Sequence, residues 1–125
     1  MDVELLFISI CSFENESDYN KIIMPMKEHY KNQTDFKLII ETKELVVGKI
    51  NIQSLYYLSS FLNSLKKHKI QYLKKTTIKI HHIYCYDLLY YLFTYLSVPL
   101  AQVEVILYNG SNIERIKSFF PKKLK

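Results

Sequence analysis

The densest group of potential metal ligands in the chain consists of His81, His82, Cys85 and Asp87. Imidazole, thiolate and carboxylate groups are the ligands that Zn²⁺ takes in proteins. Adjacent residues of a strand point to opposite faces, however, so His81 and His82 cannot easily bind one ion. No second Cys/His pair has zinc-site spacing. We therefore expect no metal site, and we interpret Asp87 as an acid in the first turn of a helix, where the helix dipole favours it.

Cys85 is also a candidate nucleophile, because a cysteine near a helix N-terminus can have a lowered thiol pKa. Its neighbours are Tyr84 and Tyr86, and the chain has only two glycines, so no glycine-rich oxyanion loop accompanies it. The acidic residues between positions 14 and 18 look like a solvated loop and not like a pair of catalytic carboxylates. We therefore expect no enzyme, no catalytic residue and no cofactor.

A lysine-rich stretch stands out from the background composition. It runs from residue 66 to residue 79 without an acidic residue, and aromatic side chains lie within it. Lysines can bind nucleic-acid phosphates by releasing counterions, and aromatic rings can stack on bases. With the tail included, the candidate nucleic-acid contacts are Lys66, Lys67, Lys69, Tyr72, Lys74, Lys75, Lys79, Lys122 and Lys123. The alternative is a solvated loop and tail that owe their lysines to codon usage.

Tyrosines form the second candidate binding surface. The chain contains 11 of them, more than one small core can hide with every hydroxyl hydrogen-bonded. Tyrosine is favoured at interfaces, where one end of the side chain is dry and the other is wet. The candidate interface residues are Tyr56, Tyr57, Tyr86, Tyr90, Tyr91 and Tyr95. The alternative is a helix over residues 84–96 that is apolar almost all round and largely covered, packed between the sheet and a neighbouring helix.

Length and composition indicate one globular domain. The 125 residues are 49% hydrophobic and 23% charged, with a net charge of +5, a mixture typical of ordinary folded domains. Arg115 is the only arginine, whereas Lys, Ile, Asn, Tyr and Phe, which have A- or T-rich codons, are frequent. This bias indicates an AT-rich genome such as that of many large DNA viruses. A virion or virus-factory component is a hypothesis that depends only on this composition.

The sequence shows no signal for export or for a membrane. No basic region precedes the apolar run over residues 5–13, and both this run and residues 88–100 are too short to span a bilayer. Cys11 and Cys85 are the only cysteines, too few for a disulfide framework. We expect two buried thiols in a reducing compartment (the cytoplasm, the nucleus or the interior of a virion) and no membrane partner.

Hydrophobic periodicity predicts alternating strands and helices. Asn51 is a good N-cap for a helix that ends near residue 66, and Pro25 favours a short helix starting there or an irregular segment. A tight turn at residues 42–43 is expected to join two strands in a hairpin. The predicted strands cover residues 3–13, 36–41, 45–50, 76–83 and 101–108, and further helices cover residues 84–96 and 111–120.

The later strands carry polar residues on one face only. Lys79 and His81 alternate with apolar residues, as do Gln102 and Glu104. A parallel sheet covered on both sides would show continuous apolar runs instead, and right-handed crossovers place the helices on a common side. The predicted fold class is α/β (α+β): a two-layer sandwich with a mixed sheet of about four to five strands and helices mainly on one face. We expect a single domain over residues 1–125, ending in a basic tail at residues 118–125.

From Phe36 to Phe120, the predicted order of a hairpin, helix, strand, helix, strand and helix resembles the STAS domain, the anti-sigma-factor-antagonist fold. STAS domains that act as phospho-switches carry an Asp-Ser-Ser-Gly-like motif between the central strand and the next helix. Here that connection reads HHIYCYD over residues 81–87, without Ser, Thr or Gly, so the switch chemistry does not carry over. The resemblance implies a compact protein-binding module, a role that many folds share.

The preferred prediction is a non-enzymatic interaction or structural module that binds itself or another protein. The alternative is a sequence-nonspecific nucleic-acid binder that uses the lysine-rich stretch and the tail.

Overall fold

The structure is a computed structural model that describes residues 3–96 and 98–121. The strands are β1 (Glu4–Ser9), β2 (Phe36–Glu41), β3 (Leu73–Ile80), β4 (Gln102–Asn109) and β5 (Asn112–Phe119). The helices are α1 (Glu16–Lys31), α2 (Ile52–Leu65) and α3 (Ile83–Tyr91), with a 3₁₀ turn η1 (Val47–Lys49) and a π-helical turn η2 (Leu92–Leu96). No helix in the described ranges has both the length and the apolar sequence needed to cross a bilayer.

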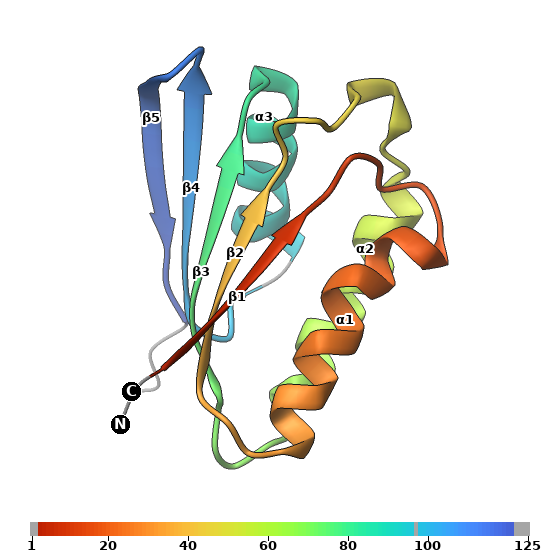
Figure 1. Cartoon of the computed structure of the whole chain (residues 1–125), viewed down its shortest axis with the longest axis vertical. Coiled ribbons are helices and arrows are strands. Elements are labelled where there is room, and N and C mark those ends of the chain that lie inside the picture. Colours follow the sequence, from red (N-terminus) through yellow and green to blue (C-terminus); the bar gives the residue numbers. More distant parts are fainter. Residues whose placement is uncertain (1–2, 97, 122–125) are drawn as a thin grey trace.

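The five strands form one mixed sheet in the order β1-β2-β3-β4-β5 (Figure 1). The first four strands are parallel, and β5 runs antiparallel to β4. One helix connects each parallel pair, and right-handed crossovers that all step in the same direction place their helices on the same face. The burial pattern agrees, since Phe36, Leu38 and Ile40 of β2 are buried while Lys37 on the opposite face is exposed. The predicted two-layer sandwich is confirmed.

The core lies between this sheet and the helical layer. Its most deeply buried side chains come from α1 and from the helix-facing sides of β2, β3 and β4: Ile22, Met26, Phe36, Ile80 and Val105. Within the described ranges no helix covers the opposite face of the sheet, and in Figure 1 α3 lies behind the sheet, next to β3. This arrangement leaves one face of the sheet open.

Residues 14–31 correct two predictions, because α1 is continuous from Glu16 to Lys31 with Pro25 inside it. A capping box starts the helix: the Asn15 side chain accepts the Asp18 N–H, and the Asp18 carboxylate accepts the Asn15 N–H. A proline in a helix interior costs about 3 kcal/mol. Fully burying Ile22 and Met26 contributes about 1.5–3 kcal/mol each, enough to offset that cost. The predicted acidic loop and the predicted helix start at Pro25 are both wrong.

Residues 45–50 do not form a strand, so the predicted hairpin is wrong as well. This segment contains η1 and contacts the N-terminal segment through an isolated bridge between Phe13 and Ile50 and a backbone hydrogen bond from the Val46 N–H to Cys11 O. The physical reason is that β2 already has β1 on one edge and β3 on the other, which leaves no edge for another strand. The apolar residues of the segment, Leu45, Val47 and Ile50, pack on the core instead.

The predicted last helix over residues 111–120 is a strand, β5. Asn109 pairs with Asn112, so Gly110 and Ser111 form the two-residue turn of a hairpin, and Gly110 has a φ of 63°, which a glycine adopts without strain. The sequence predicted a turn at Asn109-Gly110, one residue too early, and Gly-Ser between two alternating runs is itself a hairpin signal. The apparent helical spacing of Ile113 and Ile116 is an effect of the irregular register between Leu107 and Tyr108.

The order of elements that prompted the comparison with the STAS domain is therefore present only from α2 to β4, and the resemblance stays a prediction. The predicted basic tail also begins too early, because Ser118 and Phe119 belong to β5. The rest of that tail, from residue 122, lies outside the described residues.

Candidate protein-interaction site

The two adjacent histidines point apart, as strand alternation predicts. His81 lies on the open face, where its Nε2 is 2.7 Å from Glu41 Oε2 and its ring stacks on Tyr108. His82 is the N-cap of α3, and its Nδ1 accepts a hydrogen bond from the backbone N–H of Tyr84. The part of the chain that the structure describes contains no group of three or more His, Cys, Asp or Glu side chains able to hold a metal ion.

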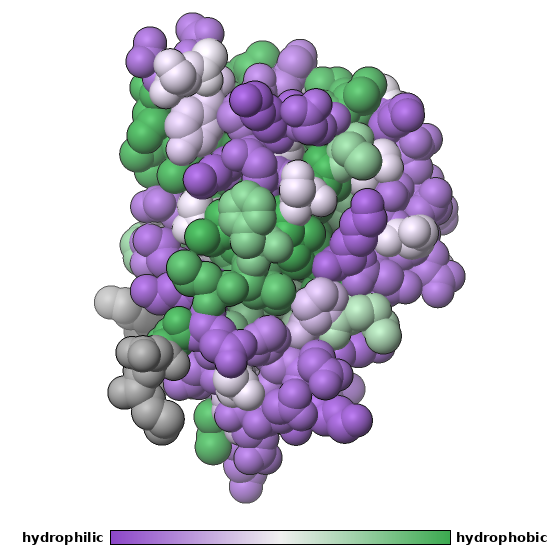
Figure 2. Space-filling model, viewed as in Figure 1, coloured by the Kyte–Doolittle hydropathy of each residue, from purple (hydrophilic) through white to green (hydrophobic). Residues whose placement is uncertain are grey.

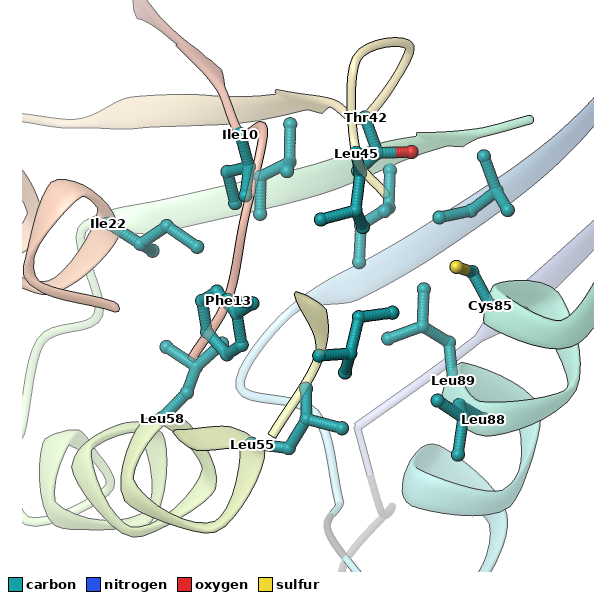
Figure 3. A pocket seen from close by; sticks show the side chains of 14 residues that line it. Ile10, Phe13, Ile22, Thr42, Leu45, Leu55, Leu58, Cys85, Leu88 and Leu89 are labelled. Carbon is teal, nitrogen blue, oxygen red and sulfur yellow. The ribbon is translucent and has the colours of Figure 1, made fainter. Parts of the chain in front are cut away.

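Cys85 lies on the buried side of α3, and its sulfur points into an apolar cavity (Figure 3). Burial raises the pKa of the Cys85 thiol, the opposite of what activates a nucleophile. Cys11 is exposed, so the prediction of two buried thiols is right for Cys85 and wrong for Cys11. Asp87 does not lie in the first turn of α3, and its interpretation as a dipole-favoured acid is wrong.

The candidate nucleic-acid contacts on β3 do not form a free basic patch. Lys75 and Lys79 lie on the open face, and Lys75 Nζ is 3.8 Å from Glu104 Oε2. Lys74 Nζ is 3.6 Å from Asp35 Oδ1. Each of these acids neutralises part of the charge that a phosphate backbone would meet.

The other members of that set lie elsewhere. Tyr72 packs edge-to-face on Tyr30, with ring centroids 5.4 Å apart, and so is not a free stacking platform. The connection from α2 to β3 carries Lys66, Lys67 and Lys69. Lys122 and Lys123 lie beyond the described residues. Among the seven candidates that the structure describes, Lys74 and Lys75 have acidic partners and Tyr72 is packed on Tyr30, and nucleic-acid binding stays a prediction.

Three of the six candidate interface tyrosines contact other elements of the chain. Tyr57 stacks on Tyr19 of α1, with centroids 5.3 Å apart. Tyr86 and Tyr90 contact β5 instead: the Arg115 guanidinium lies 5.9 Å from the Tyr86 ring, and Tyr90 meets a phenylalanine ring of that strand. These three side chains stabilise the fold. Tyr91 and Tyr95 contact each other within the helical segment, with ring centroids 5.2 Å apart, but both stay more than half exposed, as does Tyr56, so these three remain accessible to a partner.

The free tyrosines of α3 and η2 form a stripe. Tyr84, Leu88, Tyr91 and Tyr95 occupy positions i, i+4, i+7 and i+11, so they lie on one side of the helix. Tyr86 and Tyr90 face β5, whereas Leu88 lines the cavity that α3 shares with α2, so the stripe lies on the α2 side of α3. Its tyrosines are between 46% and 71% exposed, so the prediction of a largely covered helix is wrong. Tyr84 belongs to the tyrosine cluster that suggested an interface, although it is not one of the six candidate contacts, and its spacing to Tyr91 and Tyr95 is visible in the sequence.

A matching stripe runs along α2. Ile52, Tyr56, Ser59 and Asn63 have the same spacing, and they lie on the side of α2 away from Tyr57, which faces α1. Ile52, Tyr56 and Asn63 are exposed, whereas Ser59 is buried. Since α2 packs on α1 while α3 packs on β3 and β4, the two stripes flank an opening in the helical layer.

Two apolar cavities lie in this opening, with volumes of about 80 and 60 Å³. Leu55, Leu58 and Leu89 line both, and Ile40 and Ile78 of the sheet form their floor. Figure 3 shows the first cavity, with α2 on one side and α3 on the other. Apart from two threonines and a cysteine, every lining side chain is hydrophobic. We call the two stripes and these cavities the α2–α3 surface.

The α2–α3 surface is almost without charge. The α2 sequence contains no Asp, Glu, Lys, Arg or His, and α3 with η2 contains only Asp87, which is exposed at the margin of the stripe, one turn from both Tyr84 and Tyr91. In the whole chain, by contrast, 23% of the residues are charged. Depletion of charge and enrichment of tyrosine are the compositional features of the core of a protein–protein interface.

Comparisons with protein-family models, with curated proteins and with solved structures found no match to this chain. The function must therefore follow from its own geometry and chemistry.

Proposed function

We propose that the protein is a non-enzymatic structural module that associates with a second copy of itself through the α2–α3 surface. The observation that carries this proposal is the near absence of charge on two exposed helices that flank an apolar groove. Soluble monomers rarely leave a contiguous apolar area of this kind uncovered, and such areas mark interaction sites.

The exposed area is close to what a stable interface needs. An aromatic side chain buries 150–250 Å², so the exposed parts of Tyr56, Tyr84, Tyr91 and Tyr95 together amount to about 450 Å². A standard interface buries about 800 Å² per partner. Four side chains thus supply more than half of one partner's share, and Ile52 and Leu88 add to it.

The lack of charge lets a second copy occupy the α2–α3 surface. Each copy carries a net charge of +5, which opposes the approach of two copies through their charged surfaces. The uncharged α2–α3 surface lets them approach without placing like charges together. A partner with a charged surface would lose the hydration of its charges against this groove and gain no opposite charge there.

The cavities lack the polar groups that orient a substrate. Ligand sites usually combine an apolar lining with a few convergent polar groups. The hydroxyl of Thr42 donates to the backbone oxygen of Lys79, 2.7 Å away, and the Cys85 thiol is held protonated by burial. These contacts support a packing surface over an active site.

Light scattering at low and high salt tests the proposal. We expect a solution mass above the 15.0 kDa of one chain, and we expect added salt to leave it unchanged, since the interface is uncharged. Tyr91→Lys should lower the mass at least twofold, because it replaces an apolar ring and brings a charge into the buried contact. Met24→Lys, at an exposed apolar residue of α1, is the matched control and should leave the mass unchanged.

A wild-type mass of one chain would contradict self-association, as would a mass that Tyr91→Lys leaves unchanged. Binding of duplex or single-stranded DNA that weakens steeply with salt would favour the nucleic-acid alternative instead.

A further inference from the structure

The sheet ends in two edge strands, and β1 is the one whose edge is unprotected. β1 pairs only with β2 among the described strands. An edge strand presents a row of unpaired N–H and C=O groups, which proteins usually guard with charges, prolines or bulges. The β1 sequence, ELLFIS, has a single charge at its first residue and no proline.

The backbone of β1 has hydrogen-bonding groups directed away from the sheet. The N–H of Glu4 donates to Asp35 O at one end of the ladder, and the N–H of Ile10 donates to Glu41 O at the other. In a parallel ladder, alternate residues bond to the same neighbouring strand. The N–H and C=O groups of Leu5, Phe7 and Ser9 therefore point to the free edge.

Two exposed hydrophobic side chains accompany these groups. Leu5 is 67% exposed and Phe7 is 58% exposed. Both lie on the open face of the sheet, where the register sets Phe7 beside Ile39 of β2. Figure 2 shows hydrophobic residues gathered in the middle of the face in front of the sheet, with hydrophilic residues around them.

The opposite edge of the sheet is guarded. β5 carries Glu114, Arg115 and Lys117, and its pairing with β4 contains a register irregularity. Charges and bulges on an edge strand are the features that prevent pairing with another chain. The β5 edge therefore carries the charges and the irregularity that prevent the addition of another strand, and the β1 edge does not.

We propose that β1 pairs antiparallel with β1 of a second copy, about a two-fold axis through Leu6, so that one sheet continues across both copies. Directly opposed residues in an antiparallel pair share a face. An axis through Leu6 sets Leu5 opposite Phe7 of the second copy, twice, and directs the free N–H and C=O groups of both residues at each other. This one contact buries the exposed apolar side chains and gives the unpaired backbone N–H and C=O groups hydrogen-bond partners.

A second copy of β1 fits this edge better than a second copy of β5. Pairing β1 with β5 would be head-to-tail, and such a contact does not close unless the copies form a ring. It would also place Leu5 and Phe7 beside the charged β5 strand. The two-fold contact uses the same surface on both copies and closes by itself.

This contact is separate from the α2–α3 surface, because it lies on the sheet edge and not in the helical layer. A chain with two different two-fold contacts assembles into four copies or more. The combination of variants in the two places therefore separates the two proposals.

Light scattering of four proteins tests the pairing. We expect wild type at four chains or more, Phe7→Lys at two, Tyr91→Lys at two, and the double variant F7K/Y91K at one. Ile116→Lys is the matched control for Phe7→Lys, since Ile116 lies on the open face of the other edge strand and is 54% exposed. It should leave the wild-type mass unchanged.

Each failure has its own pattern. A wild-type dimer that Tyr91→Lys dissociates and Phe7→Lys does not overturns β1 pairing and leaves the proposed function standing. A dimer that only Phe7→Lys dissociates supports β1 pairing and overturns the proposed function. A mass that Ile116→Lys also lowers overturns edge pairing, because it indicates that the open faces of two sheets pack together.

A charge-pair variant tests the register. In L5E/F7K the axis through Leu6 sets opposite charges across the contact, so the mass lost in Phe7→Lys should return at low salt and fall again at high salt. An axis through Phe7 would set two lysines together and keep the copies apart. No recovery would overturn the register. The amide protons of Leu5 and Phe7 should also exchange at least tenfold more slowly in wild type than in F7K.

Discussion

The ring of Tyr90 meets the ring of Phe119 edge-on, with centroids 5.8 Å apart and planes at 72°. This contact joins α3 to β5. Phe93 packs on the same phenylalanine, and Lys117 Nζ lies 5.9 Å from the centroids of both Tyr90 and Phe119. A cation over an aromatic face is stabilising, so this side of α3 is part of the fold and the side that faces α2 is the free one.

Phe119 and Phe120 are adjacent in sequence, yet their side chains differ in exposure. Phe119 is 9% exposed and Phe120 is 63% exposed. Phe119→Ala should lower the free energy of unfolding by about 3 kcal/mol, because it removes the contacts with α3. Phe120→Ala should change it by less than about 0.5 kcal/mol, as expected for a surface site. Urea unfolding measures both values, and equal losses would contradict the strand.

The hairpin turn gives a second matched pair. Gly110 has a φ of 63°, whereas Gly48 has no positive φ and no neighbour within 4 Å of an added Cβ. Gly110→Ala should destabilise the protein by about 1–2 kcal/mol, because the left-handed conformation brings a Cβ close to the next carbonyl. Gly48→Ala should be neutral or slightly stabilising. Thermal unfolding distinguishes the two, and a neutral Gly110→Ala would argue against this turn.

The carboxyl group of Asp18 makes the free energy of unfolding depend on pH in the acidic range. Hydrogen bonds from the Glu14 N–H and from the Ser12 hydroxyl lower the pKa of Asp18 below its ordinary value of 3.8. The unfolded chain therefore takes up a proton first as the pH falls. The stabilisation is present above about pH 4 and is lost as the pH falls through the lowered pKa of the folded state.

We expect Asp18→Asn to remove this part of the acid sensitivity. From about pH 5 to about pH 3, across the ordinary titration range of a carboxyl group, the urea midpoint of wild type should fall more than that of the variant. Parallel curves would mean that Asp18 does not titrate differently in the folded and unfolded chains.

The two thiols should react at different rates. Cys11 is exposed, while Cys85 is buried and the pKa of its thiol is raised by that burial. The thiolate is the reactive form, so a disulfide reagent should modify Cys11 in the native protein and Cys85 only after denaturant is added. Mass spectrometry should find no rapid modification in Cys11→Ser and one in Cys85→Ser. Rapid modification of Cys85 would mean that its cavity is open.

Elements with strong local signals were predicted well. The N-cap at Asn51 is confirmed, and Leu55 and Leu58 of its helix line the cavities next to the core. In β4, Val103, Val105 and Leu107 are buried on one face as their alternation predicts. The six candidate tyrosines were harder to separate, because spacing along one helix does not show which neighbour covers each side of it.

By itself, the sequence determined the two layers and the open face, since alternation and helical periodicity are local and record which side of each element meets the core. The tertiary structure decided the rest. It kept α1 intact through Pro25 because burial of distant residues outweighs a local penalty. It left residues 45–50 without a strand because both edges of β2 are occupied, and it turned residues 112–119 into β5 because β4 offered a free edge. Which tyrosines stay free was settled in the same way, by contacts between segments far apart in the chain.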